Sequence, residues 1–213
     1  MKRLAVILLI SGLATAIGCA SGPSLRSVRP IDYDKRMLVA VNDVQNLTGN
    51  QEYGPLMGGL TESFTAELDE TGCFRVIEQQ KLQSIMEEMR PGTAGPAESA
   101  ATWQVGKRAG AEAVLFVDLA AVRYSSTKDS NFFASNVKET IVTILDARLA
   151  SVDTGEILAA SKISIPVTNR YRSFCLFQDG KKADQNLVVE KSLEKAIKYL
   201  VREIAWQVSK NGR

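Results

Sequence analysis

The cysteine at position 19 carries the clearest chemistry in the chain, because its thiol stands where an apolar leader gives way to polar residues. The stretch Ala16-Ile17-Gly18-Cys19 places small residues directly before the cysteine, as a lipoprotein signal peptidase accepts. The motif predicts cleavage between Gly18 and Cys19 and acylation of Cys19, for example with palmitate. The alternative is a cysteine that merely falls near an ordinary cleavage site.

Residues 1–18 have the composition of a cleaved secretory signal. Lys2 and Arg3 precede a run, 4–18, that carries no charge. A transmembrane helix needs about 20 apolar residues, so this run is too short to span, whereas its basic start and small-residue end are typical of a signal peptide. Ala20 follows the cysteine where an aspartate would resemble an inner-membrane retention signal. We therefore expect a lipid anchor at the periplasmic face of the outer membrane.

Other reactive side chains are scarce. The 213 residues include no histidine, which excludes Ser-His and Cys-His nucleophile pairs and the common histidine metal sites. Cys73 and Cys175 are too few for a thiolate zinc site; in an oxidising periplasm they could form one disulfide, or each could be a small core residue. Gly106-Lys107 lacks the first glycine and the Ser or Thr of a phosphate loop. We expect no enzyme activity, metal or cofactor.

Charge excludes a further class of partner. Removing residues 1–18 takes away two basic residues and no acidic one, so the mature chain has equal numbers of both. A nearly neutral chain offers no clustered basic face for nucleic acid, and we expect no nucleic-acid partner.

The elements that must position these residues alternate between strand and helix. Branched residues alternate in the strand pattern at 37–44, and apolar residues at Leu56, Leu60 and Phe64 recur at helical spacing. The fold class is α/β (α+β): a mixed β-sheet flanked by helices, with long β-hairpins and a C-terminal amphipathic helix. The patterns predict strands at 37–44, 74–77, 111–122, 139–152 and 156–167, and helices at 55–71, 82–89, 98–109 and 184–208.

The chain divides into a leader, a tether and one domain. Residues 1–18 are the signal peptide, 19–36 the acylated cysteine and a polar tether, and 37–210 a single periplasmic domain. The 17 residues after Cys19 reach about 60 Å when extended, so the domain stays near its membrane. Within it, Asp153-Thr154-Gly155 predicts the turn of a hairpin.

Two excursions from the domain, 120–138 and 163–183, are candidate hairpins that contact a membrane or a partner protein. Lys128-Asp129 would form the polar tip of the first and 179–181 that of the second. Apolar residues alternate only thinly in the first; the second begins with alternating Ile163, Ile165 and Val167, but its return arm is poor in apolar residues. Soluble hairpins or partner-binding loops therefore remain an alternative. Their aromatic residues are Tyr124, Phe132 and Phe133 in the first and Tyr171, Phe174 and Phe177 in the second.

Three motifs, in this order behind a lipoprotein leader, resemble those of the curli-assembly lipoprotein family, CsgG-type. They are Phe74-Arg75-Val76-Ile77-Glu78 after a helix, Gly110-Ala111-Glu112-Ala113-Val114 entering a strand, and Val152-Asp153-Thr154-Gly155-Glu156-Ile157. The resemblance spans roughly residues 37 to 165 plus the terminal helix. It implies an α/β periplasmic domain held at the inner face of the outer membrane.

In secretion-channel members of that family, protomers form rings and each contributes two amphipathic hairpins to a shared pore. The resemblance therefore implies a homo-oligomeric assembly or secretion component whose partner is a secreted or envelope protein. The alternative is a binding module without a pore, such as a cell-wall synthase activator or a flagellar-envelope lipoprotein.

Overall fold

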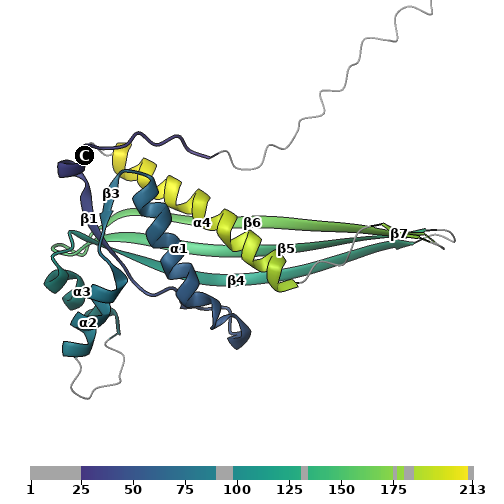
Figure 1. Ribbon diagram of the computed structural model, residues 1–213, viewed down its shortest axis with the longest axis horizontal. Coiled ribbons are helices and arrows are strands. Elements are labelled where there is room, and N and C mark those ends of the chain that lie inside the picture. The colour runs from purple at the N-terminus through teal and green to yellow at the C-terminus, as the bar shows by residue number, and fades with distance from the viewer. Residues whose placement is uncertain (1–24, 90–97, 131–133, 175–176, 180–184, 211–213) are drawn as a thin grey trace, which may run out of the picture.

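A mixed sheet of seven strands is the framework of the fold, shown as a computed structural model in Figure 1. The structure describes residues 25–89, 98–130, 134–174, 177–179 and 185–210. Six strands follow the order β3-β1-β4-β5-β6-β7, and β2 lies beside β4. Strand β1 pairs in parallel with β3 and β4, as does β2 with β4, and all other pairings are antiparallel. The strands are β1 (Met37–Val41), β2 (Gln45–Asn46), β3 (Phe74–Val76), β4 (Ala113–Ser130), β5 (Ala134–Ser151), β6 (Ile157–Phe174) and β7 (Phe177–Asp179).

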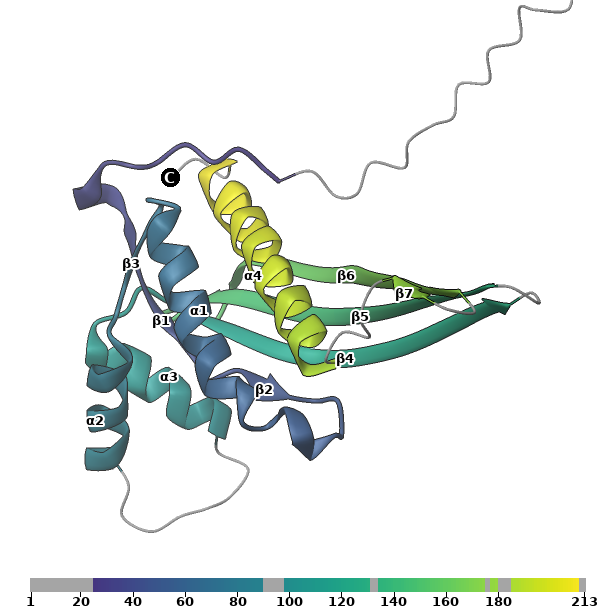
Figure 2. The same ribbon diagram turned by 45° about the vertical axis from the view of Figure 1, so that its right-hand side comes forward.

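Helices cover the two faces of this sheet unequally. Figures 1 and 2 show α1 and α4 side by side on one face, while α2 and α3 lie together near β1 and β3. The helices are α1 (Leu56–Glu70), α2 (Gln79–Met89), α3 (Glu98–Ala109) and α4 (Gln185–Lys210), with short 3-10 turns η1 (Tyr33–Lys35) and η2 (Gln51–Tyr53).

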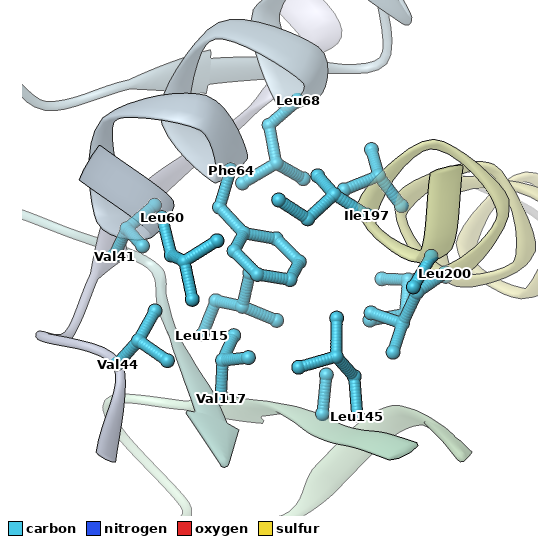
Figure 3. Close-up of a cluster of buried hydrophobic side chains, with 14 of the residues drawn as sticks. Val41, Val44, Leu60, Phe64, Leu68, Leu115, Val117, Leu145, Ile197 and Leu200 are labelled. Atoms are coloured by element: carbon cyan, nitrogen blue, oxygen red, sulfur yellow. The ribbon is translucent and has the colours of Figure 1, made fainter. Parts of the chain in front are cut away.

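Alternation along the strands separates two hydrophobic clusters. Val39 and Val41 of β1 face α1 and α4, whereas Ala40 between them packs with Leu82 of α2, as the period of two along a strand requires. Figure 3 shows Phe64 of α1 at the centre of the larger cluster, between helix and sheet residues. That ring is fully buried, so it joins α1, the sheet and α4 into one core.

Residues 25–36, part of the predicted tether, lie against this domain. The amide of Ile31 donates to the carbonyl of Gly72 at 3.0 Å, and Val28 and Ile31 pack against the larger core. The guanidinium of Arg26 binds the Glu203 carboxylate at 3.0 Å and lies 4.3 Å from the centre of the Trp206 ring. We call residues 25–36 the docked segment.

The predicted fold class is confirmed, and so is the hairpin turn at 153–155, where Ala150 of β5 pairs with Ile157 of β6. Both predicted hairpin tips were placed wrongly. Lys128 and Asp129 pair with Val137 and Asn136 within the β4–β5 ladder, and Asp179 pairs with Arg172 within the β6–β7 ladder, which begins at Phe174 and Phe177. For the second tip, the reason is that β6 runs the full length of β5, which supplies ladder partners for its backbone as far as Phe174.

Candidate functional site

Three long strands continue past the helices as a ribbon, the feature of the molecule that is most exposed to a partner. Strands β4, β5 and β6 have 18 residues each, and their far ends project together away from the helices (Figures 1 and 2). We call residues 121–130, 134–144 and 164–174 the distal ribbon. Both predicted excursions lie largely within it, the first as the tip of the β4–β5 hairpin and the second as the outer half of β6.

A β-bulge sets which side chains face which way along the distal ribbon. The register shifts between Leu119, which pairs with Leu145, and Ala121, which pairs with Ile144. The extra residue switches the alternation on β4. Val122 and Tyr124 therefore share a face with Thr143 and Ile141 of β5, which are buried toward α4.

We call the face of the distal ribbon on the α4 side the helix-side face and the opposite one the open face. Tyr124 and Tyr171, both predicted as hairpin contacts, lie on the helix-side face, because Tyr124 pairs with Ile141 and Tyr171 with Val137. Most apolar side chains of the distal ribbon gather there. They are Val122, Tyr124, Val137, Ile141, Ile165, Val167 and Tyr171.

Glu139 is a buried acidic residue on the helix-side face. It is only 7% exposed, and the Tyr124 hydroxyl donates to its Oε1 at 2.8 Å. Asn169 lies directly opposite Glu139 on β6, with a buried Nδ2 that has no hydrogen-bond partner among the described residues. The sequence analysis missed Glu139 and Asn169, although a charged residue at an inward-facing position of the predicted strand 139–152 could have indicated them.

The open face carries basic side chains that lack acidic partners. Lys138 and Arg170 are exposed and directly opposite each other on β5 and β6, and Arg123 is exposed nearer the helices. None of the three has an ion-pair partner in the part of the chain that the structure describes. Sequence reasoning did not single them out, because their neighbours come from strand pairing.

Closer to the helices the same sheet face holds paired charges. Arg148 lies 3.4 Å from Asp118, and Lys162 lies 3.5 Å from Asp146. Burial raises the pKa of the Asp118 carboxyl; the Arg148 guanidinium opposes that rise, and Asp146 adds to it. The contrast between paired charges here and unpaired ones further out separates the domain surface from the distal ribbon.

Both long edges of the distal ribbon are unpaired over most of their length. Within the described residues, β4 beyond Leu119 pairs only with β5, and β6 pairs with β7 only from Arg172 onward. At the other end of β6, Gln207 of α4 satisfies the backbone of Ala160, accepting from its amide at 3.2 Å and donating to its carbonyl at 3.1 Å. On β6 the unpaired edge begins beyond this contact, and on β4 it begins beyond Leu119, the last partner of β2.

Of the remaining predicted site residues, two are described only by their backbones and five lie outside the described residues. Phe174 and Phe177 pair directly through their backbones on β6 and β7, while their side chains are not described. Gly18, Cys19, Phe132, Phe133 and Cys175 lie outside the described residues.

Cys73 is a free, fully buried thiol beneath the docked segment. Its Sγ donates to the carbonyl of Arg29 at 3.4 Å, and burial raises the pKa of the thiol. A protonated, covered sulfur is a poor nucleophile, so Cys73 packs the docked segment against the domain. Its predicted pairing with Cys175 stays a prediction.

Elsewhere, a small pocket lies where β1 ends between α2 and α3. Gln79 donates to Asp43 at 2.7 Å and Thr102 donates to Asn42 at 3.2 Å along its wall. Within the described ranges, no cluster of three or more potential metal ligands occurs. None of the helices described there is both long and apolar enough to cross a membrane.

Comparison with known proteins gives likenesses in fold. No curated protein matches the chain. Among solved structures it is similar to the LpoB C-terminal domain from Salmonella enterica, at 18% identity and a TM-score of 0.41 over 61% of this chain and 82% of that one. It is similar to a lipoprotein from Neisseria meningitidis, at 17% identity and a TM-score of 0.46 over 73% and 92%. It is also similar to the PelC dodecamer from Paraburkholderia phytofirmans, at 11% identity and a TM-score of 0.42 over 86% and 95%. These TM-scores are too low to support a conclusion about function or assembly.

The family model described as curli production assembly/transport component CsgG matches residues 25–213. The match includes every strand and helix and begins with the docked segment. Such a component is a non-enzymatic kind of protein, and the resemblance carried by the three sequence motifs is confirmed. The chain therefore belongs to the CsgG family of curli production assembly/transport components.

Proposed function

We propose that this protein is an outer-membrane lipoprotein of the curli-assembly type, in which copies of the chain form a ring and their distal ribbons surround a passage for a secreted protein. Family membership supports the general class. The observation that carries the proposal is the distal ribbon, whose two long edges are unpaired and whose two faces differ in polarity.

Unpaired edges favour association between copies. Backbone N–H and C=O groups along an exposed strand are a template for pairing with another chain. The β4 edge and the β6 edge lie on opposite sides of the ribbon, so each copy can present one edge to each neighbour. Such head-to-tail contacts close into a ring when the rotation between copies fits.

The two faces give the ring an inside and an outside. On the helix-side face, Ile141 and Ile165 are buried in the core, and further out Tyr124, Val137 and Tyr171 follow. The open face carries exposed Arg123, Lys138 and Arg170. Polar side chains are most favourable toward an aqueous passage, and apolar ones toward lipid. β4 continues for ten residues beyond the bulge, of which Val122 still packs against the core, and a tilted strand needs about 9–11 residues to cross a bilayer.

The direction of the docked segment is consistent with a lipid anchor and a distal ribbon that reach the same membrane. In both views its N-terminal end points toward the side from which the ribbon projects (Figures 1 and 2). We propose Cys19, six residues before this segment, as the acylated anchor, with cleavage after Gly18. Lipid and distal ribbon would then reach the same bilayer.

The native mass of the full-length, acylated protein in mild detergent tests the proposal. We expect a closed ring of several copies. A monomer or dimer would contradict it and favour the alternative, a binding module such as a cell-wall synthase activator or a flagellar-envelope lipoprotein.

A short-ribbon variant identifies the surface responsible. Replacing residues 127–138 by Asn-Gly joins Ser126 to Glu139, which face each other across the hairpin, through a two-residue turn. The core residues Phe64, Leu115 and Leu145 are untouched, so circular dichroism and thermal unfolding should show a folded domain. We expect this variant to be monomeric; an unchanged ring would place the contacts elsewhere.

A further inference from the structure

The charge on the open face of the distal ribbon is one-sided. Arg123, Lys138 and Arg170 are exposed on it, and Arg172 shares it by register. Its acids among the described residues are Asp129 near the tip and Asp179 of β7, which pairs with Arg172. The helix-side face carries Lys128 and the covered Glu139. Each copy therefore presents a surplus of positive charge on the face that is more polar.

Two of these bases are held where they repel each other. Lys138 and Arg170 are direct cross-strand partners, and like charges in that position are destabilising. Bases nearer the helices, Arg148 and Lys162, each have an acidic partner within 4 Å. The unpaired bases are thus confined to the part of the sheet that the proposed ring would close around.

We propose that the open face lines the passage with rings of positive charge, Lys138 and Arg170 at one level and Arg123 at another, and that the passage selects anions and acidic polypeptide segments. This inference rests on the proposed function, because a single ribbon encloses nothing. Repetition around a ring adds the charges of all copies at the same depth, and such rings of Arg and Lys favour anions in pores. Focused in a narrow passage, that field raises the local concentration of the attracted charge.

Ion selectivity of the reconstituted protein tests this directly. The full-length, acylated protein is inserted into a planar lipid bilayer, and the reversal potential is measured across a potassium chloride gradient. We expect the sign of the reversal potential to show that chloride permeates more readily than potassium. In the same chamber a polyglutamate peptide should block the current at a lower concentration than a polylysine peptide of equal length.

A charge reversal gives the decisive comparison. In the double variant Lys138→Glu with Arg170→Glu we expect the reversal potential to change sign and the preference between the two peptides to invert. Lys81→Glu with Lys107→Glu is the matched control, since both lysines are exposed on α2 and α3 and should leave the selectivity as it was. If the glutamates prevent assembly, Lys138→Gln with Arg170→Gln should still reduce the chloride preference.

The outcomes separate this inference from the function on which it rests. Absence of any current with the unmodified protein overturns both. A current that selects potassium, or a chloride preference that the reversal leaves unchanged, overturns the basic lining while the pore stands. A sign change confined to the ribbon variant supports both.

Discussion

Glu139 places a carboxyl group between two apolar residues of the same face of β5, Val137 and Ile141. Its only hydrogen bond with described residues comes from the Tyr124 hydroxyl, at 2.8 Å. A buried acceptor that lacks a donor is destabilising, because its lost hydration is not replaced by a hydrogen bond. The Tyr124 hydroxyl therefore stabilises the distal ribbon at Glu139. Tyr124 itself is 49% exposed, so its ring contributes less than its hydroxyl.

Tyr124→Phe isolates that hydroxyl. We expect the free energy of unfolding to fall by about 1–3 kcal/mol, the range for removing one partner of a buried polar group. Urea unfolding of both proteins measures the change. Tyr171→Phe is the control, because Tyr171 lies on the same face but its hydroxyl has no hydrogen-bond partner among the described residues. Equal effects of the two substitutions would contradict this assignment.

Asp118 makes a second residue-scale prediction, on pH. Burial raises the pKa of its carboxyl in the native state above the ordinary value of 3.8. At pH values between the unfolded-state pKa and the native-state pKa, the native state therefore binds more protons than the unfolded state. The free energy of unfolding must then fall as pH rises through the native pKa. Asp118→Asn removes this contribution. We expect the stability of the variant relative to the unmodified protein to rise from pH 4 toward neutrality; a constant difference would contradict the shift.

At the scale of elements, the sequence predicts what local periodicity determines. The predicted amphipathic character of the C-terminal helix is confirmed, since Leu193, Ile197 and Leu200 of α4 are all buried. The outer halves of β4 and β5 were predicted only as the candidate hairpin 120–138 and not as continuations of the two strands, because Arg123–Ser130 is exposed on both faces and has no apolar period. Pairing with β5 in the same hairpin holds those residues extended, and a pattern within one strand does not specify that pairing.

In the candidate site, too, local sequence patterns did not specify how the strands pair. Tyr124 and Tyr171 were predicted as contact residues of two separate excursions, and the structure puts them on one face. The meeting of Lys138 with Arg170 follows from the register of β5 against β6, which no local pattern specifies. The bulge before Ala121 is equally non-local, yet it decides which face each β4 residue joins.

A buried hydroxyl pair holds α4 on the sheet at this level. The Ser192 hydroxyl donates to the Ile165 carbonyl at 3.0 Å and lies 2.6 Å from the Thr143 hydroxyl. Since a serine hydroxyl has one proton, Thr143 must be the donor in the second bond. The chain of bonds links α4 to both β5 and β6.

A double-mutant cycle measures that link. Ser192→Ala should lower the free energy of unfolding by about 1–3 kcal/mol, because the Thr143 donor loses its acceptor in the core. Adding Thr143→Val should then cost less than it does alone, with a coupling of about 1 kcal/mol. Strictly additive effects would mean that the two hydroxyls act independently.

At the scale of the whole molecule, the docked segment shortens the tether. Residues 25–36 lie on the domain, so only the six residues 19–24 separate the proposed acyl anchor from it. Extended, six residues reach about 20 Å. Trp206, which lies beneath Arg26 at 4.3 Å, must then remain near the bilayer, and Trp103 on α3 offers a second reporter.

Energy transfer from tryptophan to a dansyl-labelled lipid can tell the anchor and the ribbon apart. In a Trp103→Phe background, Trp206 is the sole donor, because the chain has two tryptophans. Inserting twelve Gly and Ser residues after position 24 should lower the transfer strongly in the short-ribbon variant, which the tether alone holds at the membrane. With the full ribbon, the transfer should persist, because the ribbon keeps the domain at the bilayer whatever the tether length. Equal loss in both proteins would mean that the ribbon does not enter the membrane, while Cys19→Ser in the short-ribbon variant should abolish the transfer altogether.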